Sequence, residues 1–265
     1  MNQIHKLMRN IYLSAFLLLA SLPATAQTPF WTENFGTGCF RGQLVSQFMS
    51  VNGAWTETAT GTNDPYADIW FVSATASGTG GQNCSDNCIT NSRSLHIGNA
   101  AIPLVGFGAD TGSTYLTGIF CGGGICSVTN KRVESPVINC LGQNNIAVSF
   151  TYYEGGEGTD DDATMVFSAD GGITWTIIDA LPKTAVGPCT LPAASWVEYS
   201  VNLPASANNN ANVKIGFTWT NDNDGQGADP SFAVDDIGLF NNISSGIAAD
   251  IAASVSVYTD ANGNI

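Results

Sequence analysis

The last predicted strand, Ser231–Phe240, constrains the fold more than any other segment because its apolar pattern changes phase halfway along. Alternate side chains of a strand point to opposite faces, so two apolar pairs lie on opposite faces here. These pairs are Phe232 with Val234, and Ile237 with Leu239. The change falls at Asp235-Asp236, which predicts either a β-bulge or a strand covered on both faces. In either case, at least one carboxylate is directed toward the interior.

A buried ionised carboxylate costs several kcal/mol unless a positive charge or a metal ion compensates it. Basic residues are scarce, with eight Lys and Arg against 22 Asp and Glu in 265 residues. Two of the basic residues, Lys6 and Arg9, belong to the N-terminal leader. The sequence therefore predicts a bound cation near Asp235, and oxygen ligands favour Ca²⁺.

Residues 1–26 are typical of a secretory signal, with a basic start, an apolar run over residues 11–20 and an A-x-A site at residues 24–26. The run is too short for a membrane span, although an uncleaved anchor is the alternative. We expect cleavage near Ala26 and a secreted or cell-surface protein without a transmembrane segment. The remaining chain has six Lys and Arg against 22 Asp and Glu, a formal charge of −16. This charge disfavours nucleic acids and anionic membranes as partners.

All seven cysteines follow the leader, and an oxidising compartment favours disulfides over metal ligands. Cys84 with Cys88, and Cys121 with Cys126, have the spacing of local disulfides across short loops. A zinc site made from the same four thiols is the alternative. One of the other three cysteines must stay unpaired or bridge to another chain; these are Cys39, Cys140 and Cys189.

Short β-type segments separated by Gly, Asn, Asp, Ser and Pro recur along the chain, with no run of helical spacing after the leader. They are residues 30–35, 69–73, 94–97, 132–138, 146–153, 163–168, 174–178, 196–203, 213–220 and 232–240. Ten strands without helices predict an all-β sandwich of two sheets. Residues 74–130 hold four cysteines and few clear strands, which predicts a disulfide-rich loop insertion and a first candidate for binding.

A pattern S-x-D-x-G-x-T-W occurs once, formed by Ser168, Asp170, Gly172, Thr174 and Trp175. The carboxylate can accept backbone N–H groups, glycine permits positive φ, and the tryptophan can pack beneath the turn. The pattern is similar to the Asp-box of sialidases, but those proteins carry several boxes and an arginine cluster. With three arginines after the leader, this chain is predicted to use the box as a structural turn.

Three segments in order, residues 31–35, 160–175 and 213–237, resemble the secreted jelly-roll domains of the MAM, reelin-repeat and cleaved-adhesin kind. The resemblance covers most of residues 30–240. It implies a jelly-roll β-sandwich of two antiparallel sheets, in which Ca²⁺ ties the first strand to the last.

Carried over from this resemblance, Glu33 and Asp235 are the expected Ca²⁺ ligands. Asp236 and Asp160 or Asp162 are further candidates, although residues 160–162 are equally explained as a solvated turn. Residues 221–227 alternate oxygen-bearing side chains like a Ca²⁺ loop, but Phe232 stands at the twelfth position, which excludes an EF-hand. This segment is compatible with a second Ca²⁺ site and with a flexible acidic loop.

Residues 241–254 have the composition of a linker. Residues 255–265 resemble the start of a type IX secretion C-terminal sorting domain, although Thr259-Asp260 departs from the usual V-Y-P-N-P. The expected organisation is a signal peptide over 1–26, a jelly-roll domain over 27–240, a linker over 241–254 and an incomplete sorting domain over 255–265.

Catalytic signatures are few. His96 is the only histidine after the leader, which excludes H-E-x-x-H metalloproteases, and no G-x-S-x-G elbow occurs. A Ser-His-Asp triad would have to use His96, and Ser94 lies on the same face of that strand. A structural histidine with its hydrogen bonds made inside the fold is the favoured interpretation. A glycosidase with a carboxylate pair remains open, with Glu154, Glu157 and Glu198 as candidates.

The leading hypothesis is a secreted, Ca²⁺-stabilised, non-catalytic module for binding or adhesion at the cell surface, with an extracellular glycan or protein as its partner. The alternative is an accessory domain of a secreted hydrolase, or such a glycosidase or protease itself. Trp55, Tyr66 and Tyr115 are candidates for stacking on sugars, although aromatic residues in β proteins usually belong to the core.

Overall fold

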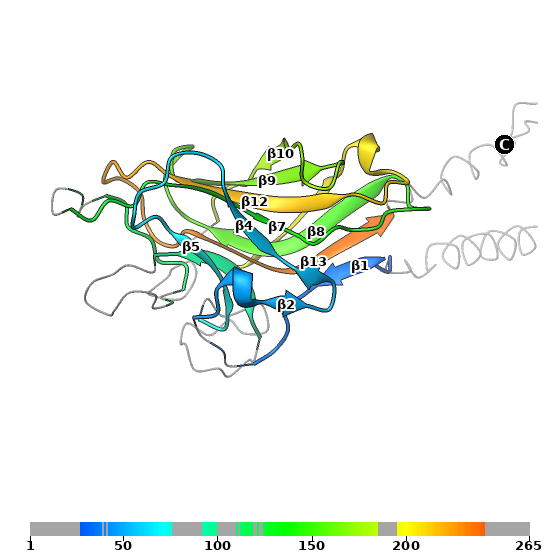
Figure 1. Cartoon of the computed structure of the whole chain (residues 1–265), viewed down its shortest axis with the longest axis horizontal. Helices are drawn as coiled ribbons and strands as arrows, with labels where there is room; N and C mark the ends of the chain where they lie inside the picture. Colours follow the sequence, from blue (N-terminus) through cyan, green and yellow to red (C-terminus); the bar gives the residue numbers. More distant parts are fainter. Residues whose placement is uncertain are drawn as a thin grey trace, which may run out of the picture.

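The computed structural model describes residues 27–38, 40, 42–75, 92–99, 110, 112–118, 121, 124–184 and 195–241. Two antiparallel sheets pack face to face as a jelly-roll β-sandwich (Figure 1), which confirms the predicted fold class. Helical structure in these ranges is limited to 3₁₀ turns, including Val45–Gln47 and Ala205–Ala207. None of the described helices is long and apolar enough to cross a membrane. The leader, the linker, the terminal fragment and the Cys84–Cys88 pair lie outside the described residues.

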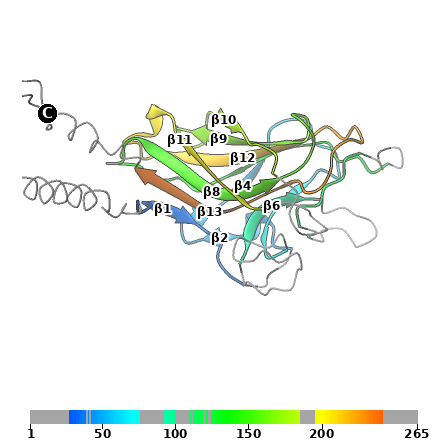
Figure 2. The ribbon, with the colours of Figure 1, turned by 180° about the vertical axis from the view of Figure 1, so that it is seen from behind.

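One sheet, called the β13 sheet, has the strand order β11-β8-β13-β6-β5, with β1 paired to β13. Its strands are β11 (Val197–Asn202), β8 (Ile146–Glu154), β13 (Phe232–Asn241), β6 (Ser94–Gly98), β5 (Ile69–Ser73) and β1 (Trp31–Glu33). Figure 2 shows β11, β8, β13 and β6 from behind. Strand β1 and the end of β13 lie at the same end of the sandwich.

The other sheet, called the β12 sheet, has the order β10-β9-β12-β7-β4. Its strands are β10 (Thr176–Ala180), β9 (Asp162–Ser168), β12 (Lys214–Asn221), β7 (Thr129–Glu134) and β4 (Thr56–Ala59). A short hairpin of β2 (Met49–Ser50) and β3 (Gly53–Ala54) precedes β4. All ten predicted strands are present, whereas β2, β3 and β4 were not predicted.

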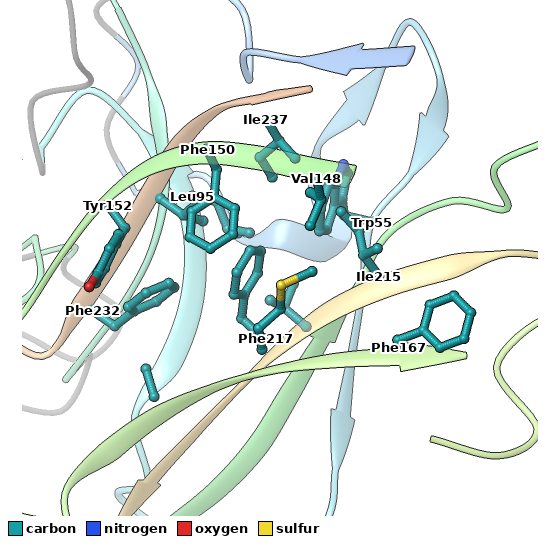
Figure 3. Close-up of a cluster of buried hydrophobic side chains, with 14 of the residues drawn as sticks. Trp55, Leu95, Val148, Phe150, Tyr152, Phe167, Ile215, Phe217, Phe232 and Ile237 are labelled. Atoms are coloured by element: carbon teal, nitrogen blue, oxygen red, sulfur yellow. The ribbon is translucent and has the colours of Figure 1, made fainter. Parts of the chain in front are cut away.

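The core lies between the sheets and is built from alternate residues of each strand. Phe217 of β12 is fully buried between Phe150 of β8 and Phe232 of β13, with ring centroids 5.2 and 5.3 Å away. Figure 3 shows these rings meeting from the two sheets. Burying aromatic rings of this size is a large share of the hydrophobic driving force of a β domain.

The phase change in β13 is a β-bulge. Asp235 pairs with Thr151 and Gly238 pairs with Ser149, so the register shifts between them. Asp236 has a φ of 51° and is exposed, whereas Asp235 is completely buried. The strand is also buried on both faces up to Asp235. Strand β13 therefore has both predicted features, a β-bulge and burial on both faces, and the Asp235 carboxylate is in the interior as expected.

The outer faces of the two sheets differ. On the β13 sheet, Tyr153, Ala233, His96 and Phe71 lie side by side on successive strands, and none is more than 3% exposed. Ser113 contacts the Tyr153 hydroxyl at 2.6 Å, so part of the 74–130 segment covers this face. The outer face of the β12 sheet carries partly exposed residues in register across four strands: Thr164, Thr218, Arg132 and Thr58.

Candidate functional site

Glu33 is 4% exposed and lies at the end of β1. Its Oε1 accepts the backbone N–H of Phe35 at 3.1 Å. Its Oε2 accepts the indole N–H of Trp55 at 3.2 Å and the Asn52 amide at 3.5 Å. Among the described residues, no Lys, Arg or His lies within 4.0 Å of this carboxylate. Neutral donors therefore surround this buried carboxylate, and no basic side chain of the described residues contacts it.

The strand register brings Glu33 and Asp235 onto neighbouring strands. Glu33 is opposite Ile237, two positions beyond Asp235. Oδ1 of Asp235 accepts the backbone N–H of Asp236 at 2.8 Å, and the Ser92 hydroxyl lies 3.5 Å from Oδ2. The two carboxylates carried over from the family resemblance are thus both buried, on strands that pair with each other.

Of the other candidate ligands, Asp236 is next to Asp235 but exposed, whereas Asp160 and Asp162 lie elsewhere. Asp162 contacts Lys183, which also contacts Glu154. Glu154 is opposite Phe232 at the start of β13, whereas β1, which carries Glu33, pairs near the end of β13. Asp160 is exposed. Within the described ranges, no group of three or more His, Cys, Asp and Glu side chains is arranged to hold a metal ion. A cation beside Glu33 would therefore depend on backbone carbonyl oxygens for much of its coordination.

Lys183 joins three segments at the start of β9. Its Nζ donates to Glu154 Oε1 at 2.6 Å, to Asp162 Oδ1 at 2.7 Å and to the backbone oxygen of Asp161 at 2.7 Å. Glu154 has no exposed surface, and its Oε2 has no hydrogen-bond partner among the described residues. Burial raises the pKa of Glu154 to about 8, although the Lys183 ammonium acts in the opposite direction. We name Lys183, Glu154 and Asp162 the lysine triad.

Beside this triad, the acidic loop 221–229 packs on residues 154–161. Asp161 accepts the Tyr115 hydroxyl at 2.8 Å and the Asp222 backbone N–H at 3.2 Å. Burial raises the pKa of Asp161 to about 6, and the charges of Asp222 and Glu157 add to this effect. Glu157 and Glu198 do not face each other as a carboxylate pair, because Glu157 is in the turn after β8 and Glu198 is exposed on edge strand β11.

His96 is fully buried, stacks on Phe71 and lies with Nε2 3.0 Å from Asp110 Oδ1. Asp110 also accepts the Ser73 hydroxyl and the Gly112 N–H. Burial alone would raise the pKa of Asp110, but the charge and hydrogen bonds around it lower that pKa well below its usual range. In the described part of the chain, Ser94 Oγ and His96 Nδ1 have no hydrogen-bond partner, and neither residue is exposed. This histidine is inaccessible to a substrate.

The Asp-box forms a closed turn between β9 and β10. Asp170 accepts the N–H groups of Ile173 and Thr174 at 3.0 and 2.9 Å, and the Ser168 hydroxyl at 2.7 Å. These hydrogen bonds, that of the Thr174 hydroxyl first, lower the pKa of Asp170 to about 2. Trp175 donates its indole N–H to the Gly172 oxygen at 3.0 Å.

Trp175 lies over the outer face of the β12 sheet. A Cβ on Gly216 would be 3.2 Å from Cζ3 of Trp175, so glycine leaves room for the indole. The Arg132 guanidinium lies 4.3 Å from the indole centroid, and its Nε and Nη2 donate to Glu134 Oε1 at 3.0 and 2.8 Å. Lys214 contacts the other oxygen of Glu134 at 3.2 Å.

We call this surface the open face; it consists of Thr58, Arg132, Thr164, Thr218 and Trp175. No local pattern in the sequence indicates this surface. The alternation of side chains along a strand indicates the face on which each threonine lies. The register of β4, β7, β9 and β12 is also needed to show that the threonines and Arg132 form one row. Of the aromatic candidates for sugar stacking, Trp55 and Tyr115 are buried in the core and Tyr66 is half-buried.

Two of the seven cysteines form a disulfide in the described structure, Cys121–Cys126. Cys140 is free and buried in the core, and burial raises the pKa of its thiol to about 11. Cys39 and Cys189 lie outside the described residues.

Comparison with known proteins gives structural similarity alone. No family model matches the chain, and no curated protein matches its sequence. Among solved structures, it is similar to the K1 cleaved adhesin domain of Lys-gingipain from Porphyromonas gingivalis W83, with 11% identity and a TM-score of 0.42 over 80% of this chain and 98% of that one.

It is also similar to the CBM22-1 xylan-binding domain of Xyn10C from Paenibacillus barcinonensis, with 9% identity and a TM-score of 0.34 over 82% of this chain and 96% of that one. At TM-scores below 0.5, these similarities carry no assignment of ligand or activity.

Proposed function

We propose that this protein is an extracellular, non-catalytic binding module whose open face binds a glycan. The observation that carries the proposal is the contrast between the two sheets. The part of the outer face of the β13 sheet formed by Tyr153, Ala233, His96 and Phe71 is covered, whereas the open face has partly exposed hydroxyl groups in a row beside Trp175. Hydroxyl groups and an aromatic edge suit a ligand rich in hydroxyl groups and C–H surfaces.

The side chains best suited to catalysis support a binding role. Glu154 is held by Lys183 and His96 by Asp110, and neither has exposed surface. A general acid or base must reach the proton that it transfers, within about 3 Å or through one water. These groups contribute to the fold and do not face a bound ligand.

Ca²⁺ is proposed as a structural ligand between the first and last strands, with Glu33 and Asp235 as its side-chain ligands. A carboxylate has about four lone-pair positions, and the three donors on Glu33 leave one for a cation. Asp160 and Asp162 are not included, because Asp160 is exposed and Asp162 already pairs with the Lys183 ammonium. The ion would supply the positive charge that the described residues around Glu33 lack.

The secretory leader over residues 1–26 is the ground for proposing export. The resemblance of residues 255–265 to a type IX sorting domain is the ground for proposing display at the cell surface. A strongly acidic exterior suits a protein that stays soluble outside the cell. The open face would then be presented to extracellular polysaccharides.

The test is affinity electrophoresis of the full chain through gels containing neutral or acidic polysaccharides. Thr218→Arg places a bulky side chain in the centre of the open face and leaves the Asp-box intact. Ser200→Arg is the matched control, because Ser200 is exposed on β11 of the other sheet. We expect retention of wild type and Ser200→Arg and loss of retention for Thr218→Arg. Equal migration of all three in every polysaccharide would contradict a glycan-binding open face.

A further inference from the structure

The lysine triad places an amine between two carboxyl groups. Lys183 follows β10, Asp162 begins β9 and Glu154 ends β8, so the fold brings Lys183 to carboxylates 21 and 29 positions earlier in the chain. Nζ is 2.6 Å from Glu154 Oε1 and 2.7 Å from Asp162 Oδ1. These distances leave the nitrogen close enough to a carboxyl carbon for attack after a small rotation.

We propose that Lys183 and Asp162 form an intramolecular isopeptide bond, with Glu154 as the proton carrier. The bond would be an amide between the lysine side chain and the aspartate side chain. It is independent of the glycan-binding role, because the triad is not part of the open face.

The reaction balances without an oxidant or a co-reactant. Glu154 takes one proton from the Lys183 ammonium, and the free amine attacks Cγ of Asp162, which forms the C–N bond. Glu154 passes this proton to the departing oxygen of Asp162, then takes a second proton from the nitrogen of the adduct. Glu154 gives this second proton to the same oxygen as the C–O bond breaks, so the oxygen leaves as water and Glu154 is again a carboxylate.

The surroundings favour this chemistry. Glu154 has no exposed surface, and its Oε2 has no hydrogen-bond partner among the described residues, so its carboxylate accepts a proton from the Lys183 ammonium more readily than an exposed carboxylate would. The Trp219 ring centroid lies 6.0 Å from Nζ and provides an apolar wall. The Lys183 side chain retains 31% exposure, which gives the water a way out. Fixed reactants of this kind reach high effective molarities.

Other Lys–Glu pairs in the described structure lack these features. Lys131 pairs with Glu57, whose side chain is 26% exposed, and has no second carboxylate partner. Lys214 pairs with Glu134, which Arg132 also contacts. Neither pair has both an electrophile and a separate proton carrier, so Lys131→Arg is a matched control.

The test is the intact mass of the full chain, reduced, alkylated and denatured, followed by peptide mapping. We expect wild type and Lys131→Arg to be lighter than their sequence masses by one water molecule, with a branched peptide joining residues 162 and 183. Lys183→Arg keeps the positive charge without the amine nucleophile, and Glu154→Gln keeps the shape without the proton carrier. Both are expected at full sequence mass.

Several results would overturn the proposal. Wild type at its full sequence mass would exclude the bond, and this result does not depend on how any variant folds. A branched peptide that joins any other pair of residues, such as Lys183 and Glu154, would contradict the assignment to Asp162. If Glu154→Gln were also lighter than its sequence mass by one water molecule, as fully as wild type, Glu154 would be excluded as the proton carrier.

Discussion

Trp219 donates its indole N–H to the carboxylate of Asp68 at 3.1 Å, and neither side chain has exposed surface. Burial raises the pKa of Asp68 from 3.8 to about 7, against the opposing effects of the Trp219 hydrogen bond and the Lys131 charge. An unfolded chain would ionise this group near its ordinary pKa. The stability of the fold is therefore coupled to the protonation of this interior carboxyl group.

This coupling predicts a pH-dependent stability. Because the folded-state pKa of Asp68 is raised, its contribution is fully present below about pH 4 and is lost as pH rises to about 7. Asp68→Asn keeps an acceptor for Trp219 but does not titrate. The difference in unfolding free energy, wild type minus variant, should fall with pH by at most about 1.4 kcal/mol per pH unit. Urea denaturation at several pH values measures it, and parallel profiles would refute the coupling.

Ca²⁺ should stabilise the native state through Glu33 and Asp235. Binding to the folded chain alone contributes about 2.7 kcal/mol when free Ca²⁺ is one hundred times Kd. A chelator should therefore lower the melting temperature of wild type and have little effect on Asp235→Asn. Asp224→Ala, an exposed carboxylate of the 221–229 loop, should respond to chelator like wild type. A wild-type melting curve that chelator leaves unchanged would exclude the ion.

Replacing Phe217 should create a cavity at the centre of the sandwich. Phe217→Ala removes a fully buried ring that contacts Phe150 and Phe232, and we expect a loss of about 3–5 kcal/mol in unfolding free energy. Ile177→Ala, at a residue 67% exposed on edge strand β10, should change it by less than about 0.5 kcal/mol. A similar loss for both variants in denaturant titrations would mean that the core lies elsewhere.

Local patterns in the sequence were sufficient for ten of the thirteen described strands and for the phase change in β13. The alternation in residues 232–240 predicted both the phase change at Asp235-Asp236 and the burial of one carboxylate. Strands β2 and β3 were missed because a two-residue strand has no measurable period. Strand β4, with the sequence TETA, lacks the apolar residues that would mark it.

Contacts between distant segments do not follow from local sequence patterns. Asp162 was considered as a Ca²⁺ ligand, and nothing in the neighbouring sequence indicated that Lys183, 21 positions later, contacts it. The stacking of Arg132 on Trp175 likewise depends on the register of β7 and on the space that Gly216 leaves. Such pairs follow from sheet topology, which one sequence does not specify.

The central claim, that the open face binds a glycan, is tested most directly by NMR mapping on the full chain. The titrant is a short oligosaccharide cut from whichever polysaccharide retains the wild-type protein in affinity electrophoresis. We predict that the largest amide and indole shifts fall on Arg132, Thr164, Trp175 and Thr218, with no product formed over long incubation. Shifts confined to other surfaces, or turnover of the oligosaccharide, would contradict the account.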